Sequence, residues 1–393
     1  MPLDGLELNP SVVGQNIAGA RKRASVSQAE LAKRLGVSRP TLIAIETGQR
    51  APSSALLAQV ASELSVAVRD LLALEPIDEQ ALVRFRDPLR TNEPARLAVD
   101  ALIDFGRYYA AIEAKAQRKQ RPRIAPPLAM HADMDIEHAA QDLAASERAR
   151  LNLGDGPLQN IELTLEQEVG VLTFGLPQLS DTKIAGIFVF ANDRGLIGLN
   201  MRQADRRRQN WTIAHEYAHF LTNRYDPEIT FEVESKKLRD KHEQFAETFA
   251  AHFLMPTYGL SRRFSELLGG IPRATVGHII LLANQYQVSF HAMCRRLESI
   301  DRIPKNTYDY VMSRGLKPIE AERTMGIESR AQRLISYPLS YIYMLSVMWR
   351  NASLSEGDVA RYLQTDRLSA RGVLDIFDGN SQFPIDEPLE RTS

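Results

Sequence analysis

The stretch WTIAHEYAHFL, residues 211–221, decides how this chain is interpreted, because it places two histidines four residues apart with a glutamate directly after the first. On an α-helix such residues lie one turn apart, so His215 and His219 can direct two imidazoles to one metal ion. Glu216 lies beside the same face, where its carboxylate can take a proton from water and later give it to a leaving amine. The pattern indicates a zinc-peptidase helix. The alternative is an amphipathic helix that only packs.

Two histidines leave a catalytic zinc ion short of one protein ligand, and the next helical segment offers carboxylates. Glu243 follows His219 by 24 residues, and a helix–loop–helix of that length can return its side chain to the histidines. Glu247, one turn further on, can accept a hydrogen bond from a ligand imidazole. His242 and His252 in the same segment are rival ligands.

The blocks around this helix resemble a known family. The run LIGLN, an arginine-rich loop, WTIAHEYAHFL and EQFAETFAAHFLMP is similar to the ImmA/IrrE-type metallopeptidases over about residues 134 to 310. The resemblance implies a thermolysin-like site in which His215, His219 and Glu243 hold zinc and Glu216 is the catalytic acid/base. Three residues depart from those usual in the family, and none of them is itself a proposed ligand: Trp211, Tyr217 and Glu247.

Near the other end of the chain, SQAELAKRLGVSRPTLIAIETGQR (27–50) has two helical segments separated by the short turn GVS. Ser27 and Ser38 are typical N-caps, and Glu30 is expected to complete a capping box with Ser27. This layout places the second helix in the major groove of DNA, and it resembles the XRE-type helix-turn-helix family. The residues expected to contact DNA are Gln28, at a phosphate, and Ser38, Arg39, Thr41 and Arg50.

Charge supports DNA binding locally although the whole chain has a formal net charge of −1. Residues 10–52 contain seven Lys or Arg against two Glu, a net charge of 7 − 2 = +5, which attracts phosphates. A specific double-stranded operator is expected to need two copies of the chain, hence a homodimer. The alternative is a helical module that docks a protein. The arginine run 206–208 is interpreted as a solvated loop, with contact to nucleic acid or an acidic substrate as its alternative.

Composition limits the remaining choices. A length of 393 residues with 44% hydrophobic residues allows two or three packed domains. The single cysteine, Cys294, excludes internal disulfides and a thiolate-rich zinc site, suits a reducing cytoplasm, and is expected to be a core residue. The longest apolar run, IAGIFVFA at 184–191, is too short to span a membrane, and the start of the chain lacks a secretory pattern. We therefore expect a cytoplasmic protein with no membrane partner.

The chain is predicted to be multidomain and mainly α. The four regions are an all-α helix-turn-helix domain (10–75), a helical linker region (76–130), an α+β zinc-peptidase domain (131–270) and a helical C-terminal region with helix-turn-helix-like elements (271–393). The basic, proline-rich stretch 117–127 is the best linker candidate. IAGIFVFA and LIGLN are predicted to form a small sheet around the turn NDRG, and the first strand can pair with an extended substrate or be purely structural.

Together these patterns predict a DNA-binding transcriptional regulator fused to a zinc-dependent endopeptidase. The family resemblance implies that the substrate is a repressor-type protein, cleaved in a stress, DNA-damage or mobile-element response. The alternative is a non-proteolytic XRE-type repressor or antitoxin whose peptidase-like fold serves as a sensor or dimerisation domain.

Overall fold

The computed structural model of the chain describes residues 10–23, 26–64, 68–72, 93–118, 123–131, 133–202, 205–223, 229–231, 241–271, 273–327 and 337–378. The chain divides into two compact units, Met1–Val83 and Arg84–Ser393. Its elements confirm the predicted multidomain, mainly α class with a small mixed sheet. Parts of the predicted linker regions lie outside the described residues, namely 76–92 and 119–122, as does the tail 379–393.

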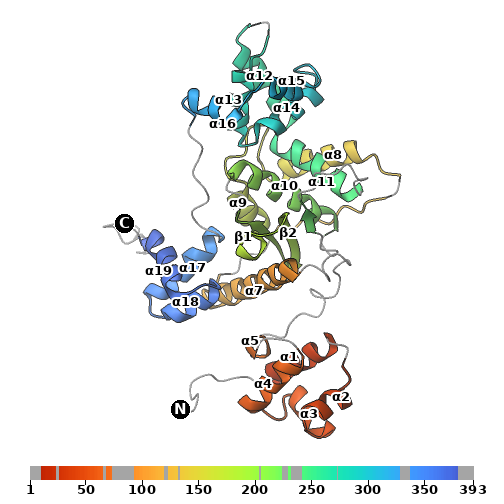
Figure 1. Cartoon of the computed structure of the whole chain (residues 1–393), viewed down its shortest axis with the longest axis vertical. Coiled ribbons are helices and arrows are strands. Elements are labelled where there is room, and N and C mark those ends of the chain that lie inside the picture. Colours follow the sequence, from red (N-terminus) through yellow and green to blue (C-terminus); the bar gives the residue numbers. More distant parts are fainter. Residues whose placement is uncertain are drawn as a thin grey trace, which may run out of the picture. The chain divides into compact units, whose positions relative to one another are not determined.

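The described part of the first unit consists of helices joined by short turns (Figure 1). The Ser27 and Ser38 side chains accept hydrogen bonds from the backbone of Glu30 and Thr41, so both predicted N-caps are confirmed. The predicted capping box is wrong, because the Glu30 carboxylate pairs with Arg34 at 2.5 Å instead of turning back to Ser27. The helices are α1 (Pro10–Arg23), α2 (Gln28–Arg34), α3 (Arg39–Glu46), α4 (Ser54–Glu63) and α5 (Val68–Leu71).

The second unit is built on a four-stranded sheet with the order β1-β3-β2-β4. β3 (Arg194–Asn200) pairs parallel with β1 (Leu172–Leu176) and antiparallel with β2 (Ile184–Ala191), which confirms the predicted strand pair. The connection is shorter than the predicted four residues: only Asn192 and Asp193 turn, with φ of 51° and 56°, the left-handed values that a two-residue hairpin requires.

β2 is not a free edge along its whole length. β4 (Ile229–Phe231) pairs antiparallel with the part of β2 from Ile184 to Ile187. An extended substrate therefore cannot pair with that part of the strand while β4 occupies it.

Helices cover both faces of the sheet, and glycines in β3 make room for them. A Cβ on Gly195 would lie 2.9 Å from the ring of Phe220 in α10 (Arg206–Asn223), while one on Gly198 would lie 3.4 Å from Leu102 of α7 (Glu93–Lys115). Alternate β3 residues thus face α10 and α7, as the two-residue period of a strand dictates. α7 comes from the predicted helical linker region, and it packs on the sheet (Figure 1).

The remaining helices of the second unit complete its hydrophobic core and form its C-terminal part. Cys294 is fully buried there, as predicted, and burial raises the pKa of its thiol to about 12. No helix among the described residues is long and apolar enough to cross a membrane. These helices are α8 (Ile136–Arg150), α9 (Ile161–Thr164) with the following π-helix (Leu165–Val169), the 3-10 turn Pro177–Leu179, α11 (Lys241–Leu254), α12 (Thr257–Leu268), α13 (Val276–Tyr286), α14 (Phe290–Ser299), α15 (Thr307–Ser313), α16 (Pro318–Thr324), α17 (Leu339–Arg350), α18 (Glu356–Tyr362) and α19 (Arg367–Asp378).

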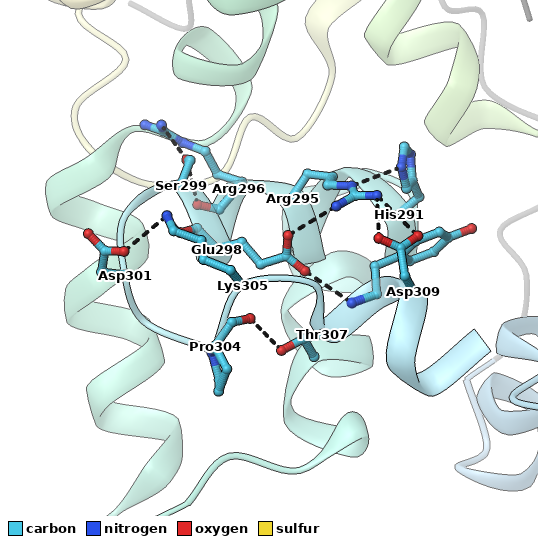
Figure 2. Close-up of polar contacts among 11 residues, drawn as sticks. His291, Arg295, Arg296, Glu298, Ser299, Asp301, Pro304, Lys305, Thr307 and Asp309 are labelled. Carbon is cyan, nitrogen blue, oxygen red and sulfur yellow. Dashed lines mark hydrogen bonds and ion pairs between the residues drawn. The ribbon is translucent and has the colours of Figure 1, made fainter. Parts of the chain in front are cut away.

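Polar contacts join α14 to α15 (Figure 2). The buried Glu298 carboxylate accepts a hydrogen bond from the backbone N–H of Tyr308 at 3.0 Å and pairs with Arg295 at 3.2 Å. Arg295 also pairs with Asp309 of α15 at 3.0 Å. Since Glu298 accepts a backbone N–H at the start of α15, it supplies a hydrogen bond that the first turn of a helix otherwise lacks.

Candidate functional site

The helix that carries the two histidines is buried almost all round. The Asp205 carboxylate accepts the N–H of Arg207 at 2.9 Å where α10 begins, and the helix then packs against β2, β3 and α11. His215 is 2% exposed, while Glu216 and His219 are fully buried. A sequence pattern could give the spacing of these residues, but their burial depends on the sheet and on α11, which pack against α10.

α11 returns a carboxylate to the two histidines. The Nε2 atoms of His215 and His219 lie 3.2 Å apart. The Glu243 carboxylate oxygens lie 3.2 Å from the first Nε2 and 3.5 Å from the second. The predicted trio is the one group of potential metal-binding side chains that converges among the described residues, and neither His242 nor His252 belongs to it.

The electrostatics of this cluster favour an ionised Glu243. Burial alone would raise the pKa of its carboxyl, but the contacts with His215 and His219 outweigh burial and hold the pKa well below its usual range. Glu247 lies on the other side of His215, with a carboxylate oxygen 3.6 Å from Nδ1. The two nitrogens of the His215 ring thus face different carboxylates.

Glu216 lies directly against strand β2, and a glycine makes this possible. A Cβ on Gly186 would lie 3.0 Å from a Glu216 carboxylate oxygen and 2.5 Å from Thr212 of the same helix. A larger residue at position 186 would therefore push α10 away from the sheet. The predicted strand included Gly186, but the sequence did not show that this residue faces Glu216.

A buried polar network fixes the back of α10 to α8. The Tyr217 hydroxyl donates to the Glu147 carboxylate at 2.7 Å, and Arg150 pairs with the same carboxylate at 2.7 Å. Burial raises the pKa of the Tyr217 hydroxyl well above its ordinary value, so it stays protonated and donates. Glu147 and Tyr217 are 70 residues apart, and no local pattern predicted their contact.

His252 lies against an arginine and not at the metal-site cluster. Its two ring nitrogens lie 3.1 and 3.2 Å from the guanidinium of Arg296 in α14, which also donates to the Met255 carbonyl at 3.1 Å. Burial, with the nearby Arg296 charge, lowers the pKa of His252 to about 4. The imidazole is therefore neutral at pH 7, and its contact with Arg296 joins α14 to the C-terminal end of α11.

This environment of His252 predicts that the free energy of unfolding decreases as the pH falls. The pKa of His252 is about 4 in the folded protein and 6.5 in the unfolded protein. The unfolded state therefore takes up a proton first as the pH falls, so the stability that the neutral His252 contributes is complete above pH 6.5 and is lost as the pH falls towards 4. We expect about 1 kcal/mol to be lost between pH 7.5 and 5, after allowance for partial exposure of the ring. Urea unfolding of the metal-free protein measures this, and His252→Gln should remove that part of the pH dependence. An equal effect of His131→Gln, at an exposed histidine, would contradict the assignment.

The candidate DNA-contacting residues occupy the first unit. Arg39 and Arg50 are exposed on and just after α3, whereas the Ser38 and Thr41 hydroxyls lie 2.8 Å apart in the first turn of α3. The amide nitrogen of Gln28 donates to Glu46 at 2.8 Å, a contact that the sequence did not predict.

Two arginines, one counted in the basic N-terminal charge and one from the arginine run 206–208, serve internal contacts. Arg21 forms a buried ion pair with Glu46 at 2.7 Å, within the first unit. In the second unit, Arg207 is part of α10, where it pairs with Glu322 at 2.5 Å and with Asp205 at 3.2 Å. The interpretation of Arg207 as part of a solvated loop is wrong, because burial of Glu322 requires a cation beside it.

Comparisons with known proteins agree with this organisation. Residues 167–298 match a peptidase family described as the IrrE N-terminal-like domain, and residues 17–71 match the helix-turn-helix family. The chain therefore combines a DNA-binding helix-turn-helix of the XRE type with an IrrE-like, metallopeptidase-like domain, as the resemblances predicted. No curated protein matches the sequence.

Two solved structures align with much of the chain. One is Bacillus thuringiensis PlcR in complex with the peptide PapR7 and DNA, at 12% identity and a TM-score of 0.17, covering 94% of this chain and 96% of that chain. The other is the apo form of the competence regulator ComR from Streptococcus vestibularis, at 14% identity and a TM-score of 0.16, covering 81% and 99%. Such low TM-scores mean that neither likeness bears on the function.

Proposed function

We propose that the chain is a transcriptional regulator whose second unit is a zinc-dependent endopeptidase. The observation that carries the proposal is the convergence of His215, His219 and Glu243. Four ligands placed tetrahedrally at about 2.0–2.1 Å from zinc lie about 3.3–3.4 Å from one another. The distances of 3.2, 3.2 and 3.5 Å between the nitrogen and oxygen atoms of the trio fit that arrangement.

The ligand types, in addition to their spacing, fit zinc. Two imidazole nitrogens and one carboxylate form the ligand set of a catalytic zinc site that leaves one position open. Glu243 supplies the negative charge, and the Glu247 carboxylate, 3.6 Å from Nδ1 of His215, favours the tautomer that presents Nε2 to the ion. A bound zinc ion would supply Lewis acidity to this site.

Glu216 is the residue we assign to proton transfer. Its carboxylate lies one residue after a ligand histidine, held against β2 by the close contact at Gly186. From there it can accept a proton from water and deliver it to the nitrogen of the leaving amine. The fixed position matters because proton transfer needs the carboxylate within hydrogen-bond distance of the reacting atoms.

Zinc content tests the proposed ligands. We expect about one zinc per chain in the wild type and loss of stoichiometric zinc in Glu243→Ala, because two histidines alone do not complete a protein site. Glu247→Ala should weaken zinc binding by about 10- to 100-fold, since it removes the acceptor for a ligand imidazole. Elemental analysis after dialysis measures both, with the exposed Glu320→Ala as the matched control. Full zinc content in Glu243→Ala would overturn the assignment.

The substrate we propose is a repressor-type protein, cleaved in the cytoplasm in a stress, DNA-damage or mobile-element response. The helix-turn-helix on the same chain supports this choice, because it can bring the peptidase to DNA at which repressors bind. We propose that the chain binds a double-stranded operator as a homodimer, because a single helix-turn-helix reads only one half-site. Incubation with purified XRE-type repressors, followed by mass spectrometry of the products, tests the substrate class.

DNA recognition is proposed to depend on Arg39, which is exposed in the first turn of α3. Arg39→Ala should weaken binding to a selected operator by about 1–3 kcal/mol and relax the preference at one base position. Selection from a random duplex library identifies the operator, and titration of operator and scrambled duplexes measures the loss. Equal losses for both duplexes would show that Arg39 contacts only phosphates.

A further inference from the structure

A cavity of about 840 Å³ lies in the second unit, away from the histidine helix. It is bounded by the C-terminal end of α7, by α9 with the π-helix, and by α17. Its volume is in the range of small-molecule sites, roughly 300–1,000 Å³. Methionine side chains there can adapt to an aliphatic ligand. The apolar lining consists of Leu163, Leu339, Tyr343, Met344, Val347 and Met348.

Two cationic side chains and one carboxylate line this cavity, and they differ in how far the protein itself binds them. Lys115 is the last residue of α7 and Arg118 follows three residues later. The Lys115 ammonium donates to a neutral group, the Tyr362 hydroxyl, at 3.4 Å. Glu166 also lines the cavity, but its two carboxylate oxygens accept the N–H groups of Leu339 at 3.1 Å and Ser340 at 2.7 Å.

Glu166 is therefore committed to the start of α17, where a carboxylate compensates helix N–H groups that have no partner within the helix. The cavity is left with an apolar wall and a cationic end. The Lys115 charge acts on Asp358, whose carboxylate is already bonded to Ser355 and Arg361.

The walls are fixed by contacts that do not involve a ligand. The Tyr109 and Ser340 hydroxyls lie 2.8 Å apart and join α7 to α17, next to the contacts of Glu166. One wall includes a π-helix, a rare element that is frequent at functional sites. A preformed site of this kind loses little ordering entropy when it binds. α9 also packs against α10, so the cavity adjoins an element that touches the histidine helix.

We propose that this cavity binds a small amphipathic carboxylate, with its chain along the apolar face of α17 and its anionic head at Lys115 and Arg118. A medium-chain fatty acid has this chemistry. The assignment does not rest on the proposed peptidase activity, because it uses only the shape, the apolar lining and the charges of the cavity.

Calorimetric titration of the full chain tests the assignment with three ligands of equal chain length, each below its critical micelle concentration: decanoate, decan-1-ol and decyltrimethylammonium. We expect one decanoate per chain, bound about tenfold more tightly than the alcohol, and no binding of the cation. Lys115→Ala combined with Arg118→Ala should lower decanoate affinity to that of decan-1-ol and leave alcohol binding unchanged. The matched control replaces two exposed cations elsewhere, Arg314 and Lys317, by alanine.

Two further measurements locate the ligand. Val347→Asp places a carboxylate on the apolar wall and should weaken decanoate binding at least tenfold. Hydrogen exchange should slow in residues 161–169 and 339–350 when decanoate binds, and stay unchanged in α12 to α16. Equal affinity for the three ligands, no binding of decanoate, or wild-type affinity in the double variant would overturn the proposal.

Discussion

Replacement of Glu216 by glutamine should lower the rate of substrate cleavage by about 10²- to 10⁴-fold, the usual contribution of general acid–base catalysis. Glutamine has nearly the same volume as glutamate and can occupy the fully buried position against Gly186 without a clash. It cannot accept a proton at neutral pH. Zinc content should be unchanged, because the proposed ligands are the side chains on either side of this position, His215 and His219, together with Glu243.

Single-turnover cleavage of a purified XRE-type repressor measures this effect, with zinc content and thermal unfolding determined on the same samples. Glu266→Gln is the matched control, since this residue makes an exposed ion pair with Arg262 in α12. Undiminished cleavage by Glu216→Gln would remove Glu216 from the reaction. If zinc-loaded wild type cleaves no XRE-type protein, the endopeptidase assignment fails and the non-proteolytic repressor with a sensor fold is supported.

The part of the site that the sequence predicted is the part set by helical geometry. The spacing of His215 and His219 follows from 3.6 residues per turn, whatever surrounds the helix. Glu243 follows His219 by 24 residues, so its prediction also required that a second helix return to the first, and the family resemblance supported this. The helix-turn-helix could likewise be predicted from the sequence, because its N-caps and turn are local signals.

Contacts between side chains distant in sequence were not predictable in the same way. Glu147 lies in an ordinary helical stretch, and the packing of both α8 and α10 against α11 brings it to Tyr217. Gly186 looked like an ordinary residue of a strand until α10 was placed against it. Arg21 was counted towards phosphate attraction, yet Glu46, 25 residues away, holds it inside the first unit. Such pairs depend on tertiary packing, which local periodicity does not specify.

The Arg21–Glu46 pair leads to the second large expected effect, on stability. Glu46 bonds to two nitrogens of Arg21, at 2.7 and 3.1 Å, and to Gln28 at 2.8 Å, so it links α1, α2 and α3. The side chains of the ion pair are 11% and 5% exposed. Removing the carboxylate leaves the guanidinium buried without a countercharge. Breaking a buried pair in this way costs about 3–5 kcal/mol.

Glu46→Ala should therefore strongly destabilise the first unit, because this loss is a large share of the about 5–15 kcal/mol that stabilises a small domain. Chemical unfolding should show the transition of the first unit at much lower denaturant and that of the second unit unchanged, and operator binding should weaken. Glu30→Ala is the matched control: its ion pair with Arg34 has side chains 40% to 50% exposed and is expected to contribute less than about 1 kcal/mol. A Glu46→Ala variant within about 1 kcal/mol of the wild type would mean that Arg21 finds another partner or water, and that the pair specifies the helix arrangement without stabilising it.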